Sequence, residues 1–114
     1  MTNLFDETVK ILKIHSKTIA DIEYIGSPET KINTNKALQL MKKTNYYNSF
    51  GRQEVAQNLM IKGDDFIMTR GEYDGSEWWD YMPSELSLPQ VDTDVKSLET
   101  QEGWESLEEI NELE

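Results

Sequence analysis

Apolar residues recur at helical spacing in two segments near the start of the chain. In LFDETVKILKIHSK the apolar stripe has three members: Phe5, Val9 and Leu12. Because these positions are three to four residues apart, we predict a helix over roughly 3–16, with Asn3 or Thr2 as its N-cap. TNKALQLMKK repeats this spacing and predicts a second helix with Thr34 as its N-cap. Its apolar stripe also has three members: Ala37, Leu40 and Met41.

The middle of the chain has the composition and alternation of β-strands. TIADIEYIGSPE is rich in β-branched residues and predicts a strand that ends before Gly26. Three apolar runs follow, divided by KGDD and YDGS, and predict an antiparallel meander over roughly 57–62, 65–72 and 77–82. Asp74-Gly75 favours a tight hairpin, since both residues tolerate positive φ. The predicted fold is α+β: a small antiparallel sheet, made of this meander and the N-terminal strand, with two helices on one face.

Charge divides the chain near residue 83. Twelve acids and ten bases precede this point, whereas residues 83–114 contain ten acids and only Lys96 as a base. Pro83 and Pro89 in PSELSLPQ favour an extended connector. We therefore expect a compact α+β domain over 1–82, followed over 83–114 by an acidic linker and a C-terminal helix.

The end of the chain, QEGWESLEEINELE, separates acidic from apolar residues by angle. On a helix, one side would present five acids: Glu102, Glu105, Glu108, Glu109 and Glu112. The opposite side would present three apolar residues: Trp104, Leu107 and Ile110. The pattern predicts an amphipathic acidic helix, and the alternative is a disordered solubilising tail. Trp104 argues against that alternative, because disordered tails seldom place Trp on an apolar stripe.

Composition removes several classes of chemistry. Among 114 residues there is no Cys and one His, which excludes disulfides, thiolate zinc sites and thiol catalysis. We expect His15 to cap the first helix, and Asp64, Asp65 and Asp74 to serve in turns. With no Cys, no histidine cluster and no nucleotide-binding motif, we expect no metal, no cofactor and no enzymatic activity. The start of the chain has no signal-peptide pattern and no apolar run could span a membrane, so we expect a cytoplasmic protein.

The segment EYDGSEWWDYM contains the strongest candidate site. Trp78 and Trp79 must face opposite sides of a strand, so one can enter the core while the other lies on the solvent face with Tyr81. Four acids surround this hairpin: Glu72, Asp74, Glu77 and Asp80. An aromatic contact rimmed by carboxylates fits a basic protein groove. The alternative is structural, with the second Trp packed under the tail helix.

Three segments carry a resemblance to known proteins. They are the IEYIGS strand at 22–27, SFGRQEVAQNL around 50–59 and the YDGSEWWDY hairpin at 73–81. In this order they resemble a largely uncharacterised group of small proteins from phages and mobile elements of Gram-positive bacteria. Size, acidity and such an origin also make the chain similar to anti-CRISPR proteins that act on type II effector nucleases. This likeness implies carboxylates that occupy the positively charged nucleic-acid channel of an effector.

Net charge supports the same class of partner. Twenty-two acids against eleven bases give a net charge of −11, which disfavours direct nucleic-acid binding and favours a basic protein. The leading hypothesis is a non-enzymatic inhibitor of a basic host protein that handles nucleic acid, with the hairpin and the tail helix as contacts. The main alternative is an adaptor that binds through the apolar stripe of the tail helix. A ligand-sequestering protein or enzyme is the third reading, and the oligomeric state stays open.

Overall fold

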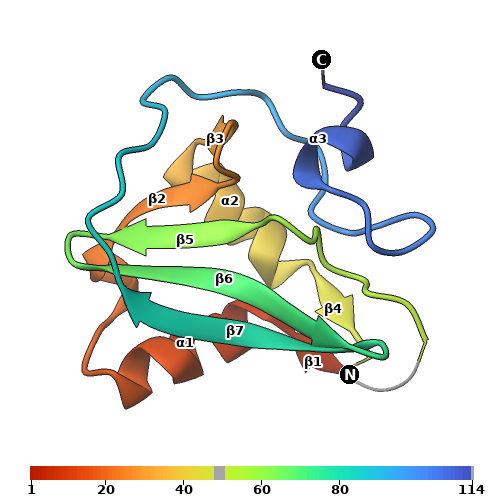
Figure 1. The fold of residues 1–114 in the computed structure, drawn as a ribbon, viewed down its shortest axis with the longest axis horizontal. Helices are drawn as coiled ribbons and strands as arrows, with labels where there is room; N and C mark the ends of the chain where they lie inside the picture. The colour runs from red at the N-terminus through yellow and green to blue at the C-terminus, as the bar shows by residue number, and fades with distance from the viewer. Residues whose placement is uncertain (48–50, 114) are drawn as a thin grey trace.

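The computed structural model describes residues 1–47 and 51–113 and confirms the predicted α+β class (Figure 1). Phe50 of the SFGRQEV segment and Glu114 lie outside the described residues. The elements, apart from a short 3₁₀ turn at Ile19–Asp21, are β1 (Thr2–Asn3), α1 (Leu4–Ile14), β2 (Ile22–Gly26), β3 (Lys31–Ile32), α2 (Thr34–Lys42), β4 (Asn45–Tyr46), β5 (Met60–Gly63), β6 (Phe66–Tyr73), β7 (Ser76–Pro83) and α3 (Leu107–Ile110). Within the described residues, no helix is long and apolar enough to cross a membrane.

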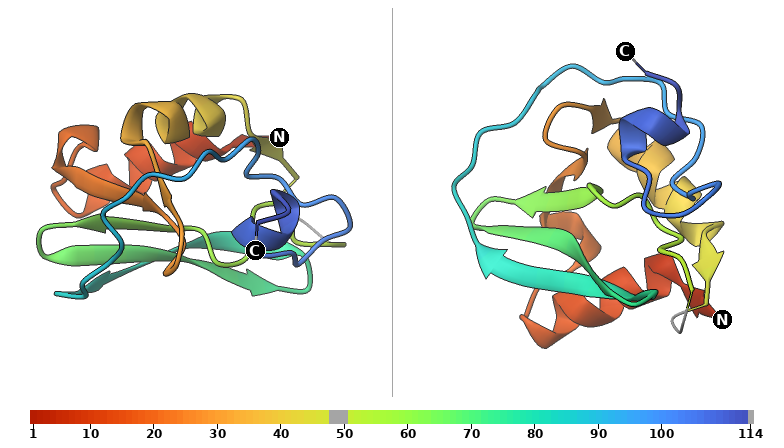
Figure 2. Two further views of the ribbon diagram at one scale, coloured as in Figure 1. Left: turned by 90° about the horizontal axis from the view of Figure 1, so that it is seen from above. Right: turned by 45° about the vertical axis from the view of Figure 1, so that its right-hand side comes forward.

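The main sheet is antiparallel, with strand order β3-β2-β5-β6-β7. β1 and β4 form a separate two-stranded sheet. Figure 2 shows α1 and α2 on the same face of the main sheet, as predicted. The β6–β7 hairpin is confirmed: Asp74 and Gly75 both have positive φ, at 53° and 87°, and Tyr73 pairs with Ser76. This is the backbone that a two-residue type I′ turn requires.

The predicted N-cap of α1 is confirmed as Asn3, whereas the buried face of α1 and the N-cap of α2 differ from the prediction. α1 begins after Asn3, whose side chain accepts a hydrogen bond from the Asp6 amide. Its buried face contains Thr8 in place of Val9. The Thr8 side chain can be buried because its hydroxyl donates to the Leu4 carbonyl at 2.8 Å. The N-cap of α2 is Asn33 and not Thr34, since the Asn33 side chain accepts from the Lys36 amide.

The tail belongs to the same hydrophobic core as the sheet and helices. Four of its apolar residues are buried in the core cluster: Val95, Leu98, Leu107 and Ile110. The backbone connects these parts as well, with Ala56 donating to the Leu98 carbonyl at 2.8 Å. Figure 1 shows α3 beside the ends of β2 and β5. The charge change at residue 83 therefore does not mark the limit of the core, which includes residues from both sides of it.

The predicted long amphipathic helix at the end of the chain is wrong. α3 covers four residues, and the chain before it turns through Gly103 and Trp104, whose φ angles are 102° and 61°. Glu112 follows with a φ of 56°. These positive φ angles lie outside the right-handed helical region, so the segment from 102 to 112 cannot form one helix. The angular separation of acids and apolar residues came from burial of Leu107 and Ile110, and not from a continuous helix.

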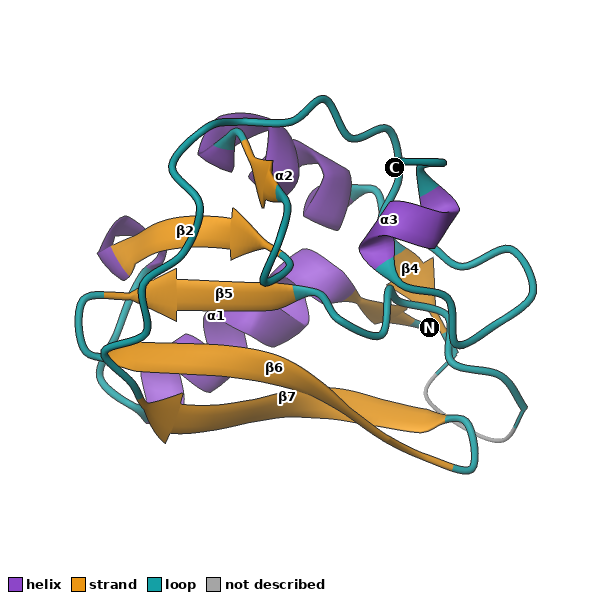
Figure 3. Ribbon diagram, turned by 45° about the horizontal axis from the view of Figure 1, so that its top comes forward, coloured by secondary structure: helices purple, strands orange, loops and turns teal. Residues whose placement is uncertain are grey.

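The face of the sheet opposite the helices carries a second, smaller apolar cluster of Tyr24, Met60 and Ile67. Leu88, from the connector that follows β7, packs against it. Figure 3 shows this connector passing in front of β2 and β5 on its way to the tail. The connector covers only part of this face, because Trp78 and Met82 of β7 stay exposed. That uncovered part is the starting point for the candidate site.

Candidate partner-binding surface

The outer face of β7 presents Trp78 beside Asp80. Trp78 is 38% exposed, and its indole nitrogen donates to Asp80 Oδ1 at 3.0 Å. The indole lies over Gly71 of β6, where a Cβ atom would come within 2.4 Å of the same nitrogen. A glycine below and a carboxylate beside it therefore fix the orientation of this exposed ring.

The tip of the hairpin extends this surface. Tyr73 is 78% exposed, and Asp74 follows it in the turn. The carboxylate of Glu72 accepts from the Gly75 amide at 2.7 Å, which holds the turn. Gly75 lies directly against Gly51, because a Cβ atom on Gly75 would be 2.5 Å from the Gly51 nitrogen. The turn is thus packed against the segment that starts at Gly51.

A loop of the tail reaches the same end of the molecule (Figure 1). Trp104, which is 48% exposed, donates its amide to the Gln53 carbonyl at 3.3 Å. Arg52 donates to the Gln101 carbonyl and fixes the other side of the loop. The Glu105 carboxylate accepts from the amides of residues 101–103, and these bonds hold its pKa below the ordinary value. The exposed Glu102 is part of this loop.

Together these residues form what we call the acidic–aromatic surface: Tyr73, Asp74, Trp78, Asp80, Glu102 and Trp104. Its three acids form no ion pair within the described residues. By contrast, the tail acids Asp92 and Asp94 pair with Lys31, Lys36 and Lys96. The surface therefore combines exposed aromatic rings with carboxylates whose charge no neighbouring base neutralises.

The two tryptophans separate as the alternation predicted. Trp79 is 5% exposed, and its indole donates to the Thr8 hydroxyl at 2.9 Å. It is therefore a core residue, and its predicted role as a partner contact is wrong. Tyr81 lies on the inner side with Trp79, since side chains two apart share a face. Its ring stacks on His15 at 3.7 Å between ring centres, so it does not lie beside the exposed tryptophan as predicted.

Glu77 is also buried, which corrects its predicted place in the acidic rim. Its carboxylate accepts from Arg70 at 2.9 Å and from the amides of Glu54 and Val55 at 2.7 and 3.2 Å. Burial raises the pKa of Glu77, although these donors oppose the shift. Arg70 also pairs with Glu7, at 3.2 Å. On β6, Arg70 falls two and four residues after the apolar Met68 and Phe66 and so shares their face, which is the signal in the sequence for this buried network.

Three acids of the tail serve the fold. Glu108 accepts from Thr30 Oγ1 at 2.6 Å, from Asn58 Nδ2 at 2.8 Å and from the Ser27 hydroxyl. Burial opposes ionisation of Glu108, but these hydrogen bonds outweigh it and lower its pKa. Glu109 completes a capping box with Ser106 at the start of α3. Glu105 is the third, through its hydrogen bonds to the amides of residues 101–103. Of the five acids on the predicted acidic side, only Glu102 and Glu112 have side chains that accept no such hydrogen bond within the described residues.

Comparison with known protein families, curated proteins and solved structures found no match to this chain. The phage-protein and anti-CRISPR resemblances therefore stay hypotheses. Within the described residues, no group of three or more His, Asp or Glu side chains is arranged to hold a metal ion.

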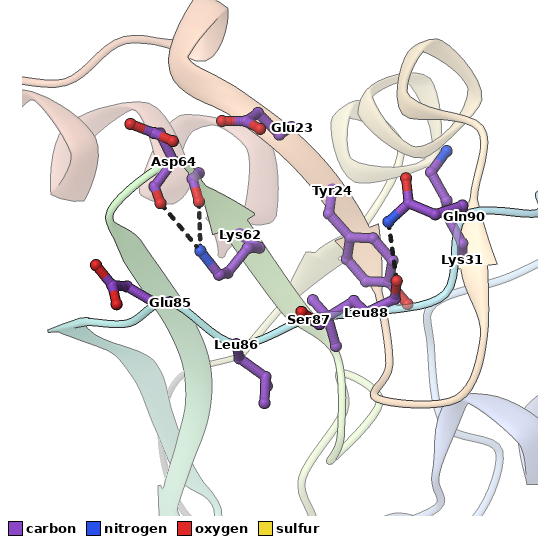
Figure 4. Close-up of a pocket in the computed structure, with 11 residues that line it drawn as sticks. Glu23, Tyr24, Lys31, Lys62, Asp64, Glu85, Leu86, Ser87, Leu88 and Gln90 are labelled. Carbon is purple, nitrogen blue, oxygen red and sulfur yellow. Dashed lines mark hydrogen bonds between the residues drawn. The ribbon is translucent and has the colours of Figure 1, made fainter.

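A polar pocket of about 460 Å³ lies between the connector and strands β2 and β5 (Figure 4). At its edge the Lys62 ammonium donates to the Gly63, Ser84 and Asp64 carbonyls at 2.6, 3.0 and 3.4 Å. These three bonds use all the donors of a lysine. Lys62 therefore fastens the connector to the sheet and has no hydrogen left for a ligand.

Charge is divided between the first part of the chain and the rest. Residues 1–47, which include both long helices, carry seven lysines and five acids. Residues 51–113, which form most of the sheet and the tail, carry sixteen acids and four bases. All six residues of the acidic–aromatic surface belong to the acidic part, since they lie between residues 73 and 104. A basic partner would be attracted to this side of the molecule.

Proposed function

We propose that this protein is a non-enzymatic inhibitor that binds a basic surface of a nucleic-acid-handling protein. The observation that supports it is the acidic–aromatic surface, which combines exposed Trp78 and Trp104 with carboxylates that form no ion pair among the described residues. Trp and Tyr are frequent at binding hot spots, and Arg or Lys side chains interact favourably with both aromatic faces and carboxylates. Charge complementarity would raise the association rate and disfavour acidic partners.

The contact residues of the adaptor alternative are buried. This alternative required the apolar side of a tail helix to be exposed, but Leu107 and Ile110 are 0% and 7% exposed. Docking through these residues would require the tail to leave the core. The hairpin end retains its exposed rings without any rearrangement, which favours the inhibitor.

The positions of the acid pairs favour binding over acid–base catalysis. Asp65 pairs with Lys17, and Asp92 pairs with Lys31. Glu72 holds the hairpin turn. Three acid pairs lie close in sequence: Asp64 and Asp65, Asp92 and Asp94, and Glu72 and Asp74. Each has at least one member occupied by a contact that supports the fold, whereas a catalytic pair needs both groups directed at a substrate.

Within this function, the partner we propose is a type II CRISPR effector nuclease. Such effectors hold nucleic acid in a positively charged channel and read DNA with Arg side chains. A surface of carboxylates and aromatic rings is complementary to both features. The resemblance to anti-CRISPR proteins motivates this choice, and the charge of the sheet and tail is consistent with it.

The experiment measures binding of the full chain to a type II effector nuclease loaded with guide RNA, at low and high salt and in competition with target DNA. Asp74→Asn with Glu102→Gln should weaken binding by roughly 5- to 30-fold, because rim charges contribute about 0.5–1 kcal/mol each. The matched control, Glu23→Gln with Glu29→Gln, removes two exposed charges elsewhere and should change little. Absence of binding, or equal effects of the two pairs, would overturn the proposal.

A further inference from the structure

The main sheet has two edges, and the chain covers only one of them. The β3 edge is two residues long and is covered by the tail, with a bridge between Lys31 and Asp92 and a hydrogen bond from the Thr93 amide to the Lys31 carbonyl at 2.6 Å. At the other edge, β7 is eight residues long and pairs only with β6 within the described residues. Figure 3 shows β7 at the border of the sheet. The long edge is therefore the uncovered one.

Apart from the charge of Asp80, β7 lacks the features that usually protect an edge strand. Proteins prevent edge-to-edge pairing with lysines, prolines, bulges or short strands. β7 contains no lysine, its one proline is the last residue Pro83, and its register with β6 is continuous from Phe66–Pro83 to Tyr73–Ser76. Its first residues, Ser76 and Glu77, have contacts of their own. The unprotected stretch is therefore 78–82.

The hairpin geometry shows which backbone groups face outward. Tyr73 and Ser76 flank a two-residue turn and form a hydrogen-bonded pair, so Gly71–Trp78 and Thr69–Asp80 are hydrogen-bonded pairs as well. The alternate residues, Trp79 and Tyr81, must direct their amide and carbonyl groups away from β6. No hydrogen bond within the described part of the chain occupies these groups. They are available to a further strand.

We infer that residues 78–82 of β7 bind an extended basic segment of the partner as an added β-strand. This inference rests on the proposed function and specifies how the partner is held. The outer face of this stretch presents Trp78, Asp80 and Met82. Cross-strand neighbours interact directly, so the added strand carries Lys or Arg opposite Asp80 and apolar residues two positions away on either side.

A second copy of the chain is a poor occupant of this edge. Antiparallel pairing of two β7 strands about the centre of the stretch would bring Asp80 close to Asp80 of the other copy. Like charges across strands are destabilising. The carboxylate at the centre of the edge therefore selects a basic segment over self-association.

The test uses the full chain and a capped peptide with the alternating sequence Val-Thr-Arg-Thr-Val, and measures amide hydrogen exchange residue by residue. Binding should slow exchange of the Tyr81 amide, which faces outward, by about tenfold or more. The Asp80 amide, which already bonds to β6, should change little. The same peptide with N-methyl groups on its pairing edge keeps its side chains and should not bind.

A charge exchange provides a second readout that does not depend on affinity alone. The unchanged protein should bind the Arg peptide better than the same peptide with Glu in place of Arg. Asp80→Lys should reverse this preference, so that the Glu peptide binds better. Glu29→Lys makes the same charge change away from β7 and should leave the preference intact. An unchanged preference in the Asp80 variant would overturn the inference, as would concentration-dependent protection of the Tyr81 amide in the protein alone.

The two proposals fail in different ways. If the effector nuclease binds with the expected salt and charge dependence but the Tyr81 amide exchanges at its free rate, the edge inference is wrong and the function stands. If the peptide protects the Tyr81 amide but no effector binds, the edge is a strand-binding site and the proposed function is wrong.

Discussion

At the scale of single residues, Glu108 connects the tail to the rest of the fold. Its carboxylate accepts hydrogen bonds from the β2–β3 loop, through Ser27 and Thr30, and from Asn58 ahead of β5. Among the residues that the structure describes, no cation pairs with this carboxylate, so neutral donors stabilise its charge. Hydrogen bonds to an ionised acceptor are stronger than neutral ones. A glutamate that the sequence marked as a surface charge is therefore a structural residue.

Glu108 should make stability fall in acid. Because its pKa is lower in the folded chain than its ordinary 4.5, its contribution is fully present above pH 4.5 and is lost as pH falls through the lowered value. Glu108→Gln should reduce the free energy of unfolding at pH 7 by about 1–2 kcal/mol and flatten its decline in acid. Urea unfolding between pH 7 and pH 3 measures both effects. The exposed control Glu29→Gln should keep the full decline, and an equally steep decline in both variants would contradict the assignment.

At the scale of elements, sequence patterns predicted what local physics determines. The first helix, the meander and the Asp74-Gly75 turn follow from spacing and from the φ preferences of two residues. The tail could not be read in this way, because Gly103 and Trp104 turn the chain and long-range contacts decide which residues are buried. Alternation also placed one tryptophan in the core, but it could not choose between Trp78 and Trp79. That choice depends on Thr8, which is 71 residues away from Trp79 in sequence.

The hairpin turn should be highly sensitive at Gly75. Its φ of 87° disfavours any side chain, and a Cβ atom would meet the backbone of Gly51 at 2.5 Å. Gly75→Val should therefore lower the free energy of unfolding by about 2 kcal/mol or more. Asp74→Gly is the matched control, since φ is positive there too and glycine adopts it readily. Thermal unfolding measures both variants, and an unchanged midpoint for Gly75→Val would show that the turn is not built in this way.

At the scale of the whole molecule, sheet, helices and tail share one core while charge divides them. Most lysines lie in residues 1–47, which include both long helices, and most acids lie in residues 51–113. Ion pairs such as Lys31–Asp92 and Lys36–Asp94 connect the two parts. The tail is thus attached by its apolar residues and by charge, even though its composition is that of a solvated segment.

Removal of the tail should test whether residues 1–82 are a domain. A chain that ends at Met82 loses Val95, Leu98, Leu107 and Ile110 from the core and exposes Val55 and Ala56, which are now fully buried. Losing even one large buried side chain costs about 2–5 kcal/mol, so the shortened chain should lack a cooperative thermal transition. A dispersed amide spectrum and a sharp transition would show instead that 1–82 folds alone.

The position of α3 has a consequence for how the protein is made. Domains usually fold as units while synthesis proceeds from the N-terminus. Here Leu107 and Ile110 fill space between segments that are translated much earlier, so the ribosome must release the chain beyond residue 110 before packing can finish. Until then the apolar surface under the tail is exposed to chaperones and to other nascent chains. A product that stalls or terminates before residue 110 would therefore keep this apolar surface exposed and be a target for proteolysis.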